Sequence, residues 1–355
     1  MPKPSFRYAA AVALLMAAVP GAMAQKAEPT ALAPRDVPAR SLPVPGDVSP
    51  EERALIAQPL RQNWDHPPTT PEGWRALATA GAATLAPNLP GMLERLHVKM
   101  ERATMDGVKV FVLTPETIPP ENRNRLLLHV HGGCYVLNPG EAALPEAVFM
   151  AGFGHYKVIA VDYRMPPDAY FPAALDDVLT VWKAALKQAD PKAMAVFGSS
   201  AGGALTLEMV LRAKHEGLPL PAAIAPGTPM SDVTKVGDTF QTNALVDNVL
   251  VSPDGFCDAA TVFYAQGHDL KDPLLSPVYG DMHGFPPTIL TTGTRDLLLS
   301  NTVRVHRKLR AAGVEAVLQV YEGQSHAHYI RDDRTPETKE AFEEIAGFFD
   351  AHLGK

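Results

Sequence analysis

Residues 198–202 place a serine among small residues directly after an apolar run. The run ends at Phe197, and the pattern that follows is Gly-Ser-Ser-Ala-Gly, with Ser200 at its centre. Small neighbours permit a tight turn from a strand into a helix, and such a turn projects the central hydroxyl. A serine hydroxyl is a weak nucleophile that needs a base, an orienting carboxylate and donors for a developing oxyanion. We therefore interpret Ser200 as a nucleophile for acyl transfer and Ser199 as its structural neighbour.

Donors for an oxyanion are predicted after the apolar run of residues 126–130. His131 is followed there by Gly132, Gly133 and Cys134. Glycines let backbone amides approach a substrate oxygen closely. With the amide of Ala201, which follows the nucleophile, Gly132 and Gly133 are the expected donors; the alternative is a simple glycine turn.

A carboxylate and a base are predicted in two later loops. Asp296 comes just past the apolar run 288–292, where active sites of open α/β sheets collect. It would hold an imidazole in the correct tautomer, although a helix cap is the alternative. After the next run, 317–321, come His326 and His328. One of them should be the base, and His326 is favoured because it comes first after the turn at Gly323.

The histidines also raise a metal-site alternative. Two His-x-His pairs occur, at 129 and 131 and at 326 and 328. Four convergent histidines are able to bind zinc. No metal signature containing Asp or Glu accompanies them, and the serine interpretation explains more residues. We therefore expect no metal site.

Strand-like and helix-like segments alternate from about His97, which predicts an α/β protein with a mostly parallel central sheet flanked by helices. The expected strands are nearly unbroken apolar runs, as in sheets buried on both faces. They cover residues 126–130, 158–161, 193–197, 222–224, 288–292 and 317–321. Expected core helices include 173–187, 204–214 and 303–312, the last with a possible cap at Asn301 and an end at Gly313.

The first hundred residues have a different organisation. Lys3 and Arg7 precede an apolar run at 8–19, and Ala22-Met23-Ala24 then offers a cleavage site before Gln25. Residues 1–24 are therefore predicted to be a signal peptide, with an uncleaved anchor as the alternative. A Pro-rich linker is expected over 25–49. Cap helices are expected over 50–97, with Ser49 capping the first helix and the second running over 72–85. The core is predicted over 98–355, with a cap insertion at about 228–270.

Composition restricts the partners. The chain has 355 residues and a formal net charge of -7, without a basic stripe or a polybasic patch. We expect a neutral or amphiphilic small-molecule partner, no nucleic acid, and no stable membrane anchoring after signal cleavage. A periplasmic or secreted location follows from the signal peptide. Cys134 and Cys257 could pair in an oxidising compartment, but Cys134 lies in a motif that needs free backbone geometry, so the two thiols are expected to stay unpaired. An edge strand near the C-terminus makes a homodimer possible.

Several segments together resemble the hormone-sensitive lipase family of α/β-hydrolases, the bacterial carboxylesterases with a helical cap. The resemblance covers about residues 98–350. It rests on His131-Gly132-Gly133 with Tyr135, and on 162–167, 171–177, 198–203, 272–277, 285–287 and the loops of Asp296 and His326.

The resemblance implies the α/β-hydrolase fold and a triad of Ser200, Asp296 and His326. It implies a cap built from the N-terminal helices plus the insertion. It also implies hydrolysis of short to medium acyl esters through an acyl-enzyme, without a cofactor. A lactonase, or a deacetylase acting on acetyl esters, would use the same triad. A non-catalytic binding module with this fold is the alternative from another class.

Two positions depart from the family pattern. Cys134 stands where the family usually has a third glycine, which puts an oxyanion amide of its own in doubt. Ser199 stands where relatives commonly have Asp or Thr, so the hydrogen bonding behind the nucleophile is expected to differ.

Overall fold

The computed structural model describes residues 34–354. The predicted signal peptide and the cleavage site before Gln25 lie outside the described residues. Two units are distinguished, Met1–Pro43 and Val44–Lys355. In the first, residues 34–43 form no helix or strand and are exposed, as a proline-rich linker would be.

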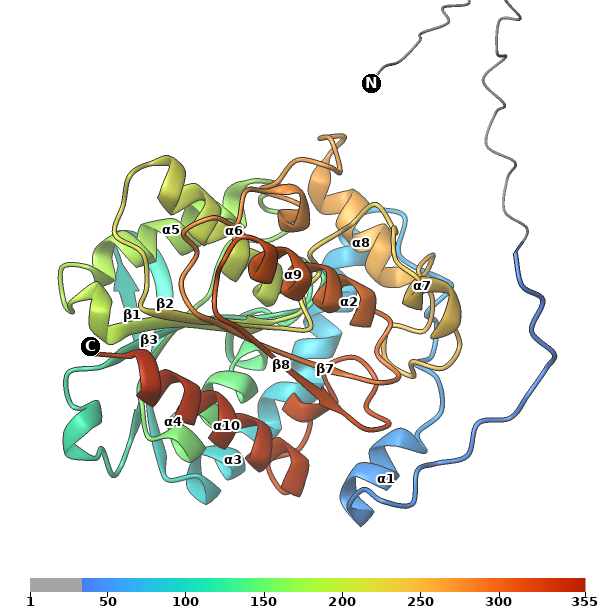
Figure 1. Cartoon of the computed structure of the whole chain (residues 1–355), viewed down its shortest axis with the longest axis horizontal. Coiled ribbons are helices and arrows are strands. Elements are labelled where there is room, and N and C mark those ends of the chain that lie inside the picture. The colour runs from blue at the N-terminus through green and yellow to red at the C-terminus, as the bar shows by residue number, and fades with distance from the viewer. Residues whose placement is uncertain (1–33, 355) are drawn as a thin grey trace, which may run out of the picture. The chain divides into compact units, whose positions relative to one another are not determined.

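An eight-stranded sheet runs through the second unit (Figure 1). The strands are β1 Val98–Met105, β2 Val108–Pro115, β3 Leu126–Val130, β4 Lys157–Val161, β5 Met194–Ser199, β6 Ala223–Gly227, β7 Thr288–Gly293 and β8 Ala316–Tyr321. Their order is β1-β2-β4-β3-β5-β6-β7-β8. β2 pairs antiparallel with β1 and β4, and the other pairs are parallel. The predicted α/β-hydrolase fold with a mostly parallel sheet is confirmed.

Helices cover both faces of the sheet. α4 Pro145–Gly154 and α10 Pro336–His352 lie on one face, and α5 Ala173–Ala185, α6 Ala201–His215 and α9 Leu299–Ala311 lie on the other (Figure 1). Successive side chains of a strand point to opposite faces. Accordingly, Leu126 and Leu128 pack into the apolar cluster that contains α5 and α6, whereas Leu127 packs with α4 and α10. Burial on both faces explains the unbroken apolar runs.

Two further groups of helices lie outside the sheet order. α1 Pro50–Ile56, α2 Pro71–Leu85 and α3 Leu89–Arg95 precede β1. Ser49 caps α1 as predicted, because its Oγ accepts a hydrogen bond from the Glu52 amide at 3.0 Å. Between β6 and β7, residues 228–287 contain α7 Thr239–Thr242 and α8 Phe256–Ala265. We call this segment the insertion; the expected cap insertion at about 228–270 lies within it.

Some elements differ from expectation. β1 and β2 form a hairpin whose strands we had not predicted individually; β1 faces solvent over most of its length, so it lacks an apolar run. The prediction that Asn301 caps α9 was wrong. The helix starts at Leu299, and Asn301 lies inside it, where its side-chain amide donates to the Asp232 carbonyl at 3.2 Å.

Two observations concern association. β8 is an edge strand of the sheet, where the strand of a second subunit would pair. The homodimer stays a prediction. Over the described part of the chain, every helix is either too short or too polar to cross a bilayer.

Candidate active site

Ser200 occupies a sharp turn between β5 and α6. Its backbone has φ 61° and ψ −123°, a region that costs a non-glycine residue about 1–3 kcal/mol. The flanking glycines make the turn possible. A Cβ on either Gly198 or Gly202 would lie 1.9 Å from the Val130 carbonyl oxygen. The small residues of the motif are therefore required by the close approach of β3 to the turn.

The His326 ring is bound to the Asp296 carboxylate. Nδ1 of His326 lies 3.0 Å from Oδ1 of Asp296, and both side chains are buried. The residues come from the loops that follow β8 and β7, at the carboxyl edge of the sheet. His328, the other candidate, faces away from Asp296: its Nδ1 contacts Glu52 at 3.0 Å and its Nε2 contacts Asn248 at 3.0 Å.

Several donors hold Asp296 as a carboxylate. Burial by itself would raise the pKa of this side chain, but the charge of His326 and a set of hydrogen bonds outweigh burial and keep the pKa below its usual value. Thr292 Oγ1 and the Leu298 amide each donate at 2.8 Å, and Thr228 Oγ1 donates as well. Thr228 had not been singled out from the sequence; its position directly after β6 was the available signal.

Asp247, in the insertion, is a second buried carboxylate that sequence reasoning missed. One of its oxygens accepts from the Leu297 amide at 2.8 Å and from the His326 amide at 3.3 Å. The other accepts from the amides of Val249 and Leu250. Burial and the charge of Asp296 raise its pKa. Asp247 thus ties the insertion to the loops that carry Asp296 and His326.

The glycine loop after β3 lies against the Ser200 turn. A Cβ on Gly132 would lie 2.6 Å from the Ser199 carbonyl oxygen, and Gly133 has φ 123°. Within residues 34–354, neither glycine N–H donates a hydrogen bond. The amide of Ala201 is at the first position of α6, where N–H groups have no acceptor within the helix. All three amides are available to a ligand oxygen.

The prediction of two unpaired thiols was wrong, because Cys134 and Cys257 form a disulfide with their Cα atoms 5.4 Å apart. We had expected the glycine loop to need a backbone incompatible with pairing. Instead Cys134 accepts a positive φ of 51° with its side chain directed to α8, which carries Cys257. The next residue reinforces this contact, since the Tyr135 ring stacks on Tyr264 of α8 with centroids 4.4 Å apart.

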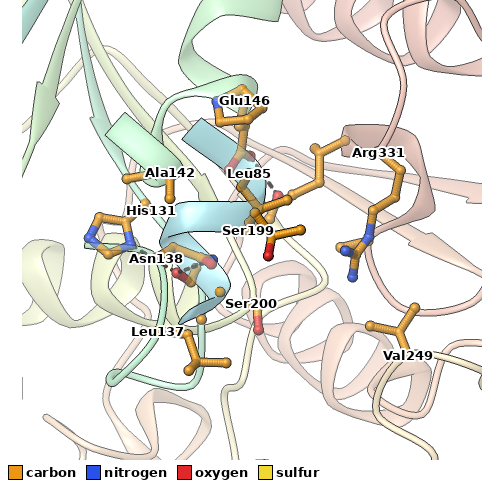
Figure 2. A pocket seen from close by; sticks show the side chains of 18 of the residues that line it. Leu85, His131, Leu137, Asn138, Ala142, Glu146, Ser199, Ser200, Val249 and Arg331 are labelled. Carbon is orange, nitrogen blue, oxygen red and sulfur yellow. Dashed lines mark hydrogen bonds between the residues drawn. The ribbon is translucent and has the colours of Figure 1, made fainter. Parts of the chain in front are cut away.

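Ser199 belongs to a buried polar group behind Ser200. Its Oγ donates to Glu146 at 2.6 Å and contacts the Tyr329 hydroxyl. The other Glu146 oxygen lies 3.1 Å from Nε2 of His129. Figure 2 shows Ser199 directed toward Glu146, with Ser200 on the side of the cavity.

The four histidines considered for zinc have separate partners. His129 contacts Glu146, His326 contacts Asp296, and His328 contacts Glu52. His131 stacks on Tyr163 with centroids 4.0 Å apart. Burial lowers the pKa of His131 to about 3, so this ring is neutral at physiological pH. Among the residues with described positions, no three His, Cys, Asp or Glu side chains are grouped so as to hold a metal ion.

One cavity of about 1030 Å³ brings these parts together. Ser200, His326, Gly132 and Gly133 all line it. Its other walls come from α2 and from Val249, Leu250 and Phe256 of the insertion. The cavity is at the upper end of the range for small-molecule sites. The N-terminal helices and the insertion therefore determine what reaches Ser200.

Comparison with known proteins also indicates a hydrolase. Residues 127–330 match a family described as alpha/beta hydrolase fold. A crystal structure of esterase E25 superposes with a TM-score of 0.87 at 43% identity, covering 90% of this chain and 99% of the other. An esterase from the bacterial hormone-sensitive lipase family gives a TM-score of 0.76 at 28% identity, covering 86% and 99%. The putative acetyl-hydrolase LipR of Mycobacterium tuberculosis is 27% identical over 79% of this chain and 89% of its own length. An esterase of Acinetobacter venetianus is 28% identical over 77% and 91%.

Proposed function

Because the chain belongs to the α/β-hydrolase fold family, among the bacterial hormone-sensitive lipase esterases, and is a carboxylesterase-type hydrolase, we propose that it hydrolyses short to medium acyl esters with Ser200 as nucleophile. One observation carries the proposal. Ser200 is held at a strained turn in the same cavity as His326, whose ring is bound to buried Asp296.

The reaction proceeds in two halves. His326 takes the Ser200 proton as Oγ bonds to the ester carbonyl carbon, and the imidazolium is stabilised by the Asp296 carboxylate. The amides of Gly132, Gly133 and Ala201 donate to the oxyanion. Collapse breaks the bond to the alcohol, which leaves with the proton from His326. Water, deprotonated by His326, then attacks the acyl-enzyme, and the acid is released with Ser200 restored.

The test is release of p-nitrophenol from p-nitrophenyl butyrate by the wild type and two serine variants. Ser200→Ala should lower turnover at least about 10⁴-fold, because the nucleophile is lost. Ser199→Ala is the matched control on the same turn, and it should lose about tenfold at most. Equal rates for the wild type and Ser200→Ala would overturn the assignment. A loss of turnover in Ser199→Ala that exceeds the loss in Ser200→Ala would assign the nucleophile to Ser199 instead.

Removal of acetyl groups is the second candidate activity. Two relatives carry the names putative acetyl-hydrolase and acetyl-hydrolase, the latter from Streptomyces hygroscopicus. A series of p-nitrophenyl acetate, butyrate and hexanoate compares acyl lengths directly. The deacetylase assignment requires a clear preference for acetate, whereas the broader esterase assignment predicts similar or higher kcat/KM for the longer chains.

We also propose that the protein is exported to the periplasm or the medium. The disulfide between Cys134 and Cys257 supports this, because such bonds persist in oxidising compartments. Cell fractionation with intact-mass measurement tests it: the mature chain should begin at Gln25 and appear outside the cytoplasm.

A further inference from the structure

Four arginines line the cavity that contains Ser200, and two of them have no carboxylate partner. Arg95 is paired with Asp333 and Arg334 with Asp332, each at 2.7 Å. In the described part of the chain, no carboxylate oxygen lies within 4.0 Å of the other two, which are Arg61 and Arg331.

The acidic residues of the cavity are already engaged. Glu141 pairs with Arg102, and Glu146 contacts His129 and Ser199. The two remaining carboxylates, Asp332 and Asp333, are the partners of the paired arginines described above. The cavity lining has as many carboxylates as arginines, but all four carboxylates are engaged by other groups. The positive charges of Arg61 and Arg331 are therefore left without a carboxylate partner, which the sequence-based expectation of a neutral or amphiphilic partner did not anticipate.

Arg331 is well placed to meet a substrate. It follows the catalytic loop, five residues after His326, and its side chain is accessible. Figure 2 shows its guanidinium directed into the cavity, in the space between Ser200 and Val249. Its side chain forms no hydrogen bond or ion pair within residues 34–354.

Arg61 comes from a different element, the segment between α1 and α2. Its amide donates to the Asn248 carbonyl at 3.0 Å, which fixes the segment on the insertion. Its guanidinium carbon lies 3.7 Å from the centre of the Phe256 ring at the start of α8. A cation over an aromatic face gains some attraction while its N–H donors stay available.

Keeping two such charges in one cavity is unfavourable without a ligand. Burial and the like charge of Arg331 lower the pKa of Arg61 to about 10. Arg331 reaches the solvent of the cavity, but the protein atoms packed around its side chain still remove part of its hydration, which lowers its pKa, and only the charge of Asp247 acts in the other direction. Asp247 does not satisfy Arg331 directly, because its oxygens accept from four backbone amides. Unfavourable electrostatics of this kind concentrate at functional sites.

We propose that Arg61 and Arg331 form an anion-binding subsite in the catalytic cavity, and that the substrate is an ester carrying a carboxylate at a distance from the scissile bond. Guanidinium groups match carboxylates in shape, charge and donor geometry. The proposal rests on the function proposed above and narrows its substrate class. A carboxylate bound here would neutralise charge that the protein leaves unpaired.

The test compares matched pairs of esters, one member of each pair being anionic. Mono-p-nitrophenyl adipate and p-nitrophenyl hexanoate differ at the far end of the acyl chain. The 4-acetoxybenzoate anion and its methyl ester differ on the alcohol side. The readout is the ratio of kcat/KM for the anionic ester to that for the neutral one, measured for the wild type, Arg61→Gln and Arg331→Gln.

For at least one pair, the wild-type ratio should exceed one, and either variant should lower it at least about tenfold, because a charge-assisted hydrogen bond is lost. Added salt should lower the wild-type ratio and have less effect on Arg331→Gln. Arg123→Gln is the charge-matched control. It removes an exposed positive charge that precedes β3, at the amino end of that strand and so away from the carboxyl ends where the cavity lies. This variant should change the ratio less than about twofold.

Two results would overturn the subsite. The first is a wild-type ratio below one for both pairs. The second is a ratio of kcat/KM values that neither variant changes. Arg331 would then act as a counter-charge to Asp247, and Arg331→Gln would lower kcat/KM for the anionic and the neutral ester alike, together with the melting temperature. Failure of the proposed function is separate, because it appears as Ser200→Ala cleaving the neutral esters at the wild-type rate.

Discussion

The disulfide between Cys134 and Cys257 should stabilise the protein and hold the glycine loop against α8. It joins residues 123 positions apart. For a loop of this length, chain entropy gives about 5 kcal/mol of stabilisation at 25 °C. The entropy of unfolding of the unit Val44–Lys355 is roughly 0.65 kcal/mol/K, from about 2.1 cal/mol/K per residue. A loss of stability divided by this entropy gives the shift in Tm. Replacing both cysteines by alanine should therefore lower Tm by about 8 °C.

Thermal melts followed by circular dichroism, with and without a reducing agent, measure this effect. The oxidised wild type should melt about 8 °C above the reduced wild type, and the double alanine variant should not respond to the reductant. Activity near the melting temperature should fall earlier in the variant, because Cys134 follows Gly133 in the glycine loop. Two titratable thiols in the native, unreduced protein, or equal melting temperatures, would refute the reasoning.

Two further predictions concern buried groups around the site. Glu52→Gln removes the charge that holds His328 in the loop of His326, so kcat for p-nitrophenyl butyrate should fall about tenfold with little change in KM. The control is Glu51→Gln, which changes the exposed neighbouring residue and should retain kcat. Equal effects of the two variants on kcat would refute the role of Glu52 in positioning this loop. His131 is neutral in the fold with a pKa of about 3, so below pH 6.5 the unfolded chain binds a proton that the folded chain does not. The free energy of unfolding should fall by about 2 kcal/mol from pH 7 to pH 5 in urea titrations, and His131→Phe should lose this dependence.

Local patterns were sufficient to predict which segments after strands meet at the candidate site, while the roles of their residues stay predictions. Ser200, Asp296 and His326 come three, four and five residues after the end of an apolar run, and the carboxyl edge of a parallel sheet brings such loops together. The glycines around Ser200 were predictable for the same reason, since a sharp turn next to β3 leaves no room for a Cβ.

Contacts between distant segments were not predictable. Glu52 meets His328 across more than 270 positions, and no spacing in the sequence relates the two. The same holds for Arg61 and Arg331, whose common cavity exists only once the N-terminal helices are packed. The disulfide was missed because the backbone at Cys134 was judged from its glycine neighbours. β1 was missed because a solvent-facing strand carries no apolar run, although Asp106-Gly107 is a hairpin signal.

Covalent labelling of the serine tests the central claim most directly. A fluorophosphonate probe reacts with a serine only when a base and oxyanion donors activate it. Intact-mass measurement after labelling should show one adduct on the wild type, and peptide mapping should place it on Ser200, with none on Ser200→Ala. An adduct on any other residue, or hydrolysis of p-nitrophenyl butyrate that continues in fully labelled protein, would contradict the assignment of Ser200 as the nucleophile.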